Sequence, residues 1–70
     1  MAINKFSTSA AIERNNGKQS SSGINWSYAE FTTQRDMALF IVECNNNGYR
    51  TRNEYTQDGK FYVQFHHYED

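Results

Sequence analysis

The run from Thr32 to Gly48 constrains the fold of this chain most, because it holds the longest apolar block in the sequence. Thr33, followed three residues later by Asp36, resembles the capping box that begins a helix. Gly48 suits the position just after a helix, where the backbone often turns left-handed. The pattern therefore predicts a helix over about residues 33–47. At about 100° per residue, its core-facing stripe would consist of Met37, Phe40, Ile41 and Cys44.

A second interpretation of the same block is a buried strand, because the run Met37–Cys44 is short and contains Phe, Ile and Val. The capping signals at both ends favour the helix. Leu39 and Val42 lie off the apolar stripe, so the expected helix is apolar nearly all round. We expect either a second layer of the protein or a partner to cover these two side chains.

The segment before the helix predicts one clear strand and one weaker region. Ile24, Trp26 and Tyr28 alternate with polar or small residues, which is typical of a strand with one buried face. Residues 1–23 contain the turn signal Asn15–Gly17, followed by a serine-rich run. We expect this region to be either a flexible arm or a weak first hairpin, whose first strand would precede the turn.

The dipeptide Asp58-Gly59 is a strong hairpin signal, and it separates the strand-like segments Tyr49–Gln57 and Lys60–His67. A two-residue turn would place the arginines of the first segment on the apolar face of the second. A three-residue loop, with Gly59 in a β-bulge, places those arginines on the polar face and Tyr55 on the apolar one. A slip of one residue turns every side chain to the opposite face. Because charged side chains belong in water, we predict the three-residue loop.

Helix and hairpin together predict an α+β fold, in which one helix packs on a small antiparallel sheet. The expected order is ββαββ, or βαββ if residues 1–23 stay outside the sheet. The 70 residues are expected to form a single domain, residues 1–70. Apolar residues make up only 37% of the chain, but aromatic residues reach 16% and bury large areas. The core is therefore small, and dimerisation is a recognised way to extend it.

Charge and hydropathy argue against nucleic acid, membranes and secretion. A net charge of −1 and a pI near 6.0 give no general attraction to nucleic acid or to anionic membranes. No run approaches the ~18 apolar residues of a membrane span, and the chain does not begin with a signal-peptide pattern. The single cysteine, Cys44, cannot form an internal disulfide, which suits a reducing compartment. We expect a soluble, cytoplasmic protein.

No residue pattern predicts an enzyme, a cofactor or a metal site. His66 and His67 are adjacent, and neighbours in a strand point to opposite faces, so the two rings cannot easily share one ion. Zinc requires about three or four converging ligands, and Cys44 is the only thiol. A chain of this length also struggles to enclose the ~300 Å³ of a small-molecule pocket. We therefore expect a non-catalytic protein with no cofactor and no metal.

The polar face of the C-terminal hairpin is the best candidate for a binding surface, because Arg and Tyr are enriched at binding hot spots. The hypothesis is a module that binds another protein or itself, with a homodimer as one form. The alternative is binding of RNA or single-stranded DNA, since Tyr beside Arg can stack on bases, although the net charge disfavours it. The same residue types are also ordinary on a solvated strand. The predicted binding residues are Arg50, Arg52, Tyr62, Gln64, His66 and Tyr68, with Leu39 and Val42 as a second patch.

The strand WSYAEF (residues 26–31), the Thr-capped helix and the Asn-Gly-Tyr that opens the terminal hairpin form a familiar order of elements. In this order and in element lengths, about residues 26–65 resemble small phage-encoded inhibitors. These include host RNA polymerase inhibitors and some anti-CRISPR proteins. The resemblance implies a protein that covers a surface of a host protein, in the host cytoplasm. It assigns no functional role to any single residue.

Overall fold

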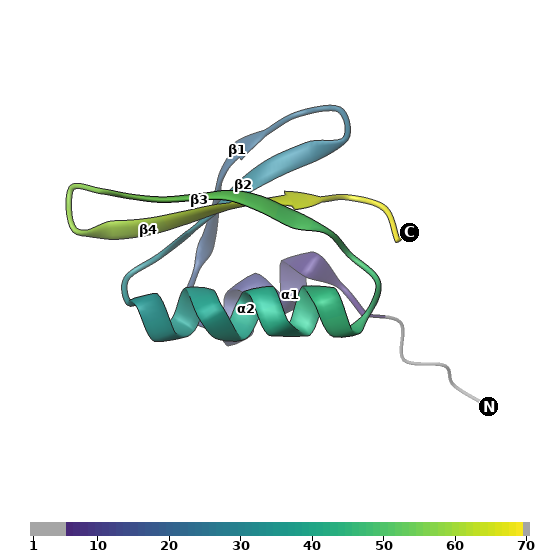
Figure 1. Ribbon diagram of the computed structural model, residues 1–70, viewed down its shortest axis with the longest axis horizontal. Helices are drawn as coiled ribbons and strands as arrows, with labels where there is room; N and C mark the ends of the chain where they lie inside the picture. Colours follow the sequence, from purple (N-terminus) through teal and green to yellow (C-terminus); the bar gives the residue numbers. More distant parts are fainter. Residues whose placement is uncertain (1–5, 70) are drawn as a thin grey trace.

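The computed structural model describes residues 6–69. Residues 1–5, which belong to the predicted arm, and Asp70 lie outside the described residues. The described part of the chain begins with a short helix, which is followed by a pair of strands, a second helix and a second pair of strands (Figure 1). The elements are α1 (Thr8–Arg14), β1 (Lys18–Ser22), β2 (Trp26–Phe31), α2 (Gln34–Asn46), β3 (Thr51–Gln57) and β4 (Lys60–His66).

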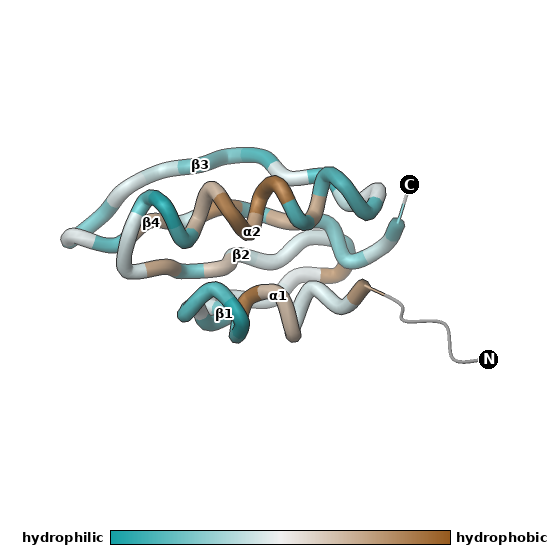
Figure 2. The backbone as a smooth tube through the Cα atoms, turned by 90° about the horizontal axis from the view of Figure 1, so that it is seen from below, coloured by the Kyte–Doolittle hydropathy of each residue, from teal (hydrophilic) through white to brown (hydrophobic). Residues whose placement is uncertain are grey.

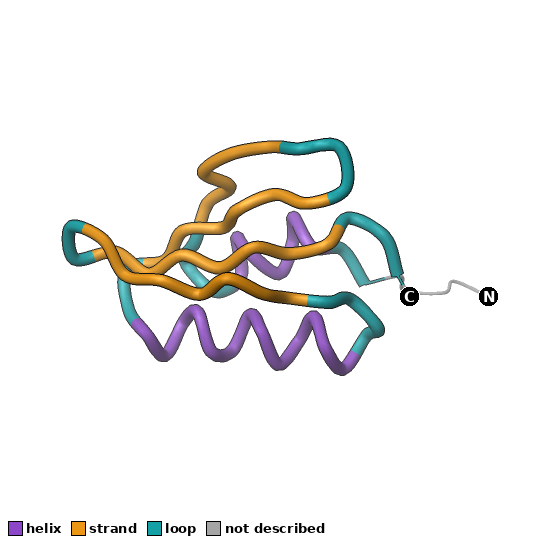
Figure 3. The backbone as a smooth tube through the Cα atoms, turned by 45° about the horizontal axis from the view of Figure 1, so that its top comes forward, coloured by secondary structure: helices purple, strands orange, loops and turns teal. Residues whose placement is uncertain are grey.

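The four strands form one antiparallel sheet in the order β1-β2-β4-β3. Both helices lie on the same side of this sheet, and neither covers the other side (Figures 1 and 3). The predicted α+β fold, with a helix packed on a small antiparallel sheet, is confirmed. The element order is αββαββ, so the predicted order lacked the first helix. We call the uncovered side of the sheet the outer face.

The connectivity of the strands and helices is a circular permutation of a common one. If its two ends were joined and the chain were opened before β4, the elements would read β-α-β-β-α-β with the sheet order 4-1-3-2. This is the connectivity of the ferredoxin-like folds. The likeness concerns topology alone, because such folds carry many unrelated functions.

Helix α2 begins and ends as its sequence predicts. The Thr33 hydroxyl oxygen accepts a hydrogen bond of 3.1 Å from the backbone N–H of Asp36. At the other end, Gly48 has a φ of +84°, and the N–H of Tyr49 reaches back to the carbonyl oxygen of Cys44 at 2.8 Å. This is the Schellman pattern, which a left-handed glycine permits at no steric cost.

Helix α1 replaces the first strand that was predicted before the Asn-Asn-Gly turn. The Ser7 side chain accepts a hydrogen bond of 3.2 Å from the N–H of Ala10 and caps the helix start. Asn16 has a φ of +62°, and the N–H of Gly17 reaches the carbonyl oxygen of Ile12 at 2.8 Å, which is again a Schellman end. The prediction of a hairpin turn here was wrong. Hairpin turns and helix C-termini both use residues with a left-handed backbone, so the Asn-Asn-Gly run is compatible with either.

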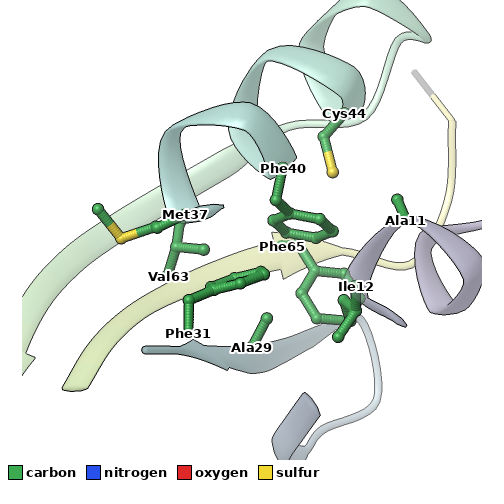
Figure 4. Packing of buried hydrophobic residues seen from close by; sticks show 9 residues of the cluster. All are labelled: Ala11, Ile12, Ala29, Phe31, Met37, Phe40, Cys44, Val63 and Phe65. Atoms are coloured by element: carbon green, nitrogen blue, oxygen red, sulfur yellow. The ribbon is translucent and has the colours of Figure 1, made fainter. Parts of the chain in front are cut away.

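The core lies between the inner face of the sheet and the two helices (Figure 4). Phe40 points from α2 onto Phe31 and Phe65, with ring centroids 5.2 and 5.6 Å away. The predicted core stripe of α2 is confirmed, with Ile41 partly buried against the cluster. In Figure 2 the apolar residues of α2 gather in its middle, between hydrophilic ends. The buried apolar residues are Ala11, Ile12, Ala29, Phe31, Met37, Phe40, Cys44, Val63 and Phe65.

A polar contact joins the two helices. The carboxylate of Glu43 on α2 accepts hydrogen bonds from the Arg14 guanidinium and, at 2.7 Å, from the side-chain amide of Asn15. The same Asn15 amide donates to the carbonyl oxygen of Ala11 at 2.9 Å, so this buried polar side chain is satisfied. The bonds from Arg14 and Asn15 lower the pKa of Glu43 despite its partial burial.

Strand β2 presents the opposite face from the one its alternation suggested. Trp26 and Tyr28 lie on the outer face, and Ile24 lies in the preceding turn with 89% of its surface exposed. The prediction that these three residues form the buried face was therefore wrong. Small side chains let the helices approach the sheet closely, and a Trp ring in that position would hold them apart. The buried residues of β2 are Ser27, Ala29 and Phe31.

The C-terminal hairpin turns in two residues, and not in the predicted three. Gln57 pairs with Lys60, and between them Asp58 and Gly59 have φ values of +53° and +76°. Two successive left-handed residues form the turn whose twist matches that of paired strands. The strand pair does contain a β-bulge, but at Asn53, whose φ is +55°.

Burial of Cys44 predicts a thiol that does not react in the folded protein. Burial, helped by the charge of Glu43, raises the pKa of the Cys44 thiol to about 12. The native state thus holds this proton more tightly than the unfolded chain does. The resulting stabilisation is present below about pH 9 and is lost as the pH rises towards 12.

At pH 8 we expect Cys44 to react with a chromogenic disulfide reagent roughly a hundredfold or more slowly in native protein than in urea-unfolded protein. Equal rates in the two states would show that the thiol is accessible in the fold.

Candidate binding surface on the outer sheet face

The structure brings the six residues predicted on the hairpin together on or beside the outer face. Tyr62, Gln64 and His66 alternate along β4 on this face, and Arg52 of β3 pairs with Gln64. The remaining two flank the strands: Arg50 precedes β3, and the Tyr68 ring lies 5.8 Å from that of His66.

The second predicted patch lies elsewhere. Leu39 and Val42 belong to α2, on the helix layer, and remain 43% and 53% exposed. Among residues 6–69 no second layer covers them. They therefore do not join the outer face.

The bulge at Asn53 places two distant side chains of β3 on the same face. Arg52 pairs with Gln64 and Tyr55 with Tyr62, so three steps along β3 match two steps along β4. In a regular strand, residues three apart point to opposite faces. Bulges recur where a strand must re-aim a side chain, and here the bulge brings Arg52 and Tyr55 together on the outer face.

The Arg52 side chain is held at two points, by Gln64 and by the Trp26 ring. Its Nε donates a hydrogen bond of 2.7 Å to Oε1 of Gln64, which also accepts one of 2.8 Å from the Asn53 amide. Its guanidinium carbon lies 3.7 Å from the centre of the Trp26 ring, and that of Arg50 lies 5.5 Å away. Cations at these distances are attracted to the electron-rich face of the indole.

Tyrosine rings continue this layer along the sheet. Tyr55 and Tyr62 stack with centroids 4.8 Å apart and planes 9° apart, and Tyr28 meets Tyr55 edge-on at 5.7 Å. Two rings lying flat side by side could not bring their centres so close, so the stacked pair stands upright on the sheet. An incoming partner therefore meets ring edges and hydroxyl groups, which combine apolar and polar contacts.

An ion-pair cluster marks the far end of the outer face. The Glu30 carboxylate lies 3.2 Å from the Lys60 ammonium and 3.5 Å from that of Lys18. Burial acts to raise the pKa of Glu30, but the two lysines outweigh it and lower that pKa. Burial and the nearby negative Glu30 raise the pKa of the Tyr62 phenol, which keeps its proton.

The two adjacent histidines serve opposite sides of the sheet. His66 packs against the Trp26 ring at 4.8 Å, on the outer face. The Nε2 atom of His67 lies 2.7 Å from the hydroxyl of the buried Ser27 and 3.3 Å from the carbonyl oxygen of Gly23. Within the described residues, no three His, Cys, Asp or Glu side chains come together as a metal site.

A small hollow lies between α1 and the start of β1. Its volume of about 190 Å³ is smaller than the ~300–1,000 Å³ of typical small-molecule sites. Its lining residues are Ser9, Ile12, Glu13, Gly17, Lys18 and Gln19. The hollow is therefore not the candidate site, and the outer face is.

Sequence reasoning missed the aromatic residues at the centre of the outer face: Trp26, Tyr28 and Tyr55. The available signal was Phe31, which lies on the same face of β2 as Ser27 and Ala29. It shows that both faces of β2 carry large apolar residues, so alternation alone does not identify the buried face. No helix among residues 6–69 is long and apolar enough to cross a membrane. Comparisons with protein-family models, with curated proteins and with solved structures find no match to this chain.

Proposed function

We propose that this protein is a non-catalytic module that binds another protein through the outer face of its sheet. The observation that carries the proposal is the layer of aromatic rings and arginines, held in place by one another on a face that neither α1 nor α2 covers. Aromatic and Arg side chains dominate binding hot spots. Because neighbouring contacts already order these side chains, little conformational entropy remains to be lost on binding.

A protein partner fits this face better than a nucleic acid does. The Tyr55 and Tyr62 rings stack on each other, and Arg52 covers one side of the Trp26 ring, so one face of each of these rings is already occupied and cannot stack on a base. The chain also carries a net charge of −1, which gives no overall attraction to phosphates.

Binding of RNA or single-stranded DNA is the second candidate. It is favoured because the outer face holds tyrosines beside an arginine on the adjacent strands β2, β4 and β3. Counterion release makes such binding fall steeply with salt. An affinity for oligouridylate that drops by about an order of magnitude or more between 50 and 200 mM salt would favour this candidate.

The proposal also covers setting and mode of action. A module of this kind acts by occluding a surface of its partner, as the phage-encoded inhibitors that it resembles in element order are expected to do. The cytoplasm is the proposed compartment, because the single Cys44 needs no oxidising environment. Self-association through the same face is a distinct outcome, and sedimentation equilibrium of the isolated chain measures it directly.

Capture from lysate of cells in which the protein occurs, with nuclease added, tests the proposal. We expect the double variant Arg52→Glu, Tyr62→Ala to lose a captured protein by at least about tenfold, since hot-spot residues each contribute about 2 kcal/mol or more. Arg35→Glu with Leu39→Ala, exposed on α2, is the matched control and should capture as wild type does.

Two results would oppose the proposal. Undiminished capture by the double variant would remove the outer face as the interface. Loss in the α2 control alone would move the interface to the patch of Leu39 and Val42.

A further inference from the structure

We propose that Arg52, held against the Trp26 ring, is a preformed receptor for a carboxylate side chain of the protein partner. The inference rests on the proposed function and adds the chemistry of the partner: an acidic residue with an apolar residue two positions away. The structural basis is the unused hydrogen-bonding capacity of Arg52.

Arg52 keeps its recognition groups available while the rest of the side chain is immobilised. Its Nε–H donates to Gln64, and its guanidinium carbon lies 3.7 Å from the centre of the Trp26 ring. Among residues 6–69, the two terminal amino groups of Arg52 donate no hydrogen bond, and the side chain is exposed. An arginine with both terminal amino groups available matches the two oxygens of a carboxylate in a bidentate pair.

The surroundings make this arginine a built feature of the fold. Oxygen Oε1 of Gln64 accepts hydrogen bonds from both Arg52 and Asn53. That convergence requires the bulge at Asn53, which adopts a left-handed backbone. Left-handed residues other than glycine cost energy and gather at functional sites, and a held guanidinium loses less entropy when it binds.

The charges of the outer face favour an acidic partner. The Arg52 guanidinium lies against the Trp26 ring, with the Arg50 guanidinium nearby, and the positive charge of Arg52 marks this end. The Glu30 carboxylate at the other end is engaged by Lys18 and Lys60. A second copy docked face to face would offer from its own outer face the Glu30 carboxylate, which two lysines already engage, and would gain little. A different protein with a free acidic side chain complements the face better.

Spacing along the sheet gives the partner a pattern. Two residues of β2 that are two positions apart mark the two parts of the face. The Trp26 ring contacts the Arg52 guanidinium, and the Tyr28 ring contacts Tyr55 in the tyrosine layer. Two residues of extended chain span about 6.6 Å. An extended partner segment would therefore place a carboxylate on Arg52 and an apolar side chain against the tyrosine edges two positions away.

Paired peptides test the carboxylate receptor without knowledge of the natural partner. The probe is a blocked peptide with glutamate and leucine two positions apart, separated by serine, and its match carries glutamine for glutamate. Binding is followed by ¹⁵N NMR at the Arg52 Nε–H and the Trp26 indole N–H. We expect both signals to shift with the glutamate peptide, and the glutamine peptide to bind about tenfold more weakly, about 1.4 kcal/mol.

Substitutions at Arg52 separate the effect of its bidentate geometry from the effect of its positive charge. Arg52→Lys keeps the charge but removes the bidentate geometry, so the preference for glutamate should fall to about twofold or less. Arg35→Lys, the matched change on α2, should leave the preference intact. Backbone NMR spectra of each variant check that the fold is retained.

The outcomes discriminate between this inference and the proposed function. Equal binding of the two peptides, or no binding of either, would overturn the carboxylate receptor, while capture of a partner from lysate could still support the protein-binding module. Stronger, salt-steep shifts of the same signals with oligothymidylate would assign the site to phosphates and overturn it as well. A twofold mass in sedimentation, with Arg52 signals dependent on protein concentration, would make a second copy the occupant and would also overturn it.

Discussion

Replacing Phe40 by alanine is expected to lower the free energy of unfolding by about 3–5 kcal/mol. Phe40 is fully buried, and its ring contacts those of Phe31 and Phe65, which come from two different strands. Truncation would remove these contacts and leave a cavity at the centre of the only described apolar cluster. In chains below about 70–80 residues a single core rarely supplies more than about 3–5 kcal/mol, so this variant should lose most of its stability and be substantially unfolded at 37 °C.

Urea denaturation followed by tryptophan fluorescence measures the effect, and Leu39→Ala is its matched control. Leu39 is the neighbour of Phe40 in α2 but is 43% exposed, so its truncation should cost less than about 1 kcal/mol. Equal losses for the two variants would contradict the burial pattern of α2 and the choice of Phe40 as its core anchor.

A methyl group added at Gly17 is expected to destabilise the fold by about 1–3 kcal/mol, the usual cost of overpacking. The new Cβ would meet the Phe31 ring at Cε2 and, at 2.6 Å, at Cδ2, and it would lie 2.8 Å from the carbonyl oxygen of Glu30. Moving both the Glu30 carbonyl oxygen and the buried Phe31 ring away from the new Cβ would lower the stability of the fold. Gly17 is therefore required where the chain passes from α1 to β1 close to the C-terminal end of β2.

A double-mutant cycle isolates the steric cause. Phe31→Leu removes part of the ring that a Cβ at residue 17 would strike. In the background of this substitution, Gly17→Ala should cost at least about 0.5 kcal/mol less than it does in wild type, because residues in contact are not additive. Additive losses in thermal or urea unfolding would show that the ring does not cause the strain.

The prediction placed Arg52 on the correct face of the hairpin, but it put the bulge at the wrong residue. Sequence reasoning put a bulge at Gly59 so that Arg52 would lie with Gln64, and the structure pairs these residues through a bulge at Asn53. One extra residue anywhere in β3 shifts all side chains beyond it, so Arg52 was placed correctly and Tyr55 was not. Nothing local in the Arg-Asn-Glu run marks the bulge, because Asn tolerates a left-handed backbone but does not demand it.

The sequence by itself determined what depends on near neighbours: the span and caps of α2, its buried stripe through Phe40, and the hairpin at Asp58-Gly59. Capping, helical period and turn preference act over a few residues and can be read along the chain.

Only the tertiary structure decided which face of β2 is buried. Both faces carry large apolar residues, so the choice depends on how closely two helices can approach Ser27 and Ala29. That distance follows from packing between segments far apart in sequence, and no local pattern encodes it. The outer face, with Trp26 beneath Arg52, is the consequence of that choice.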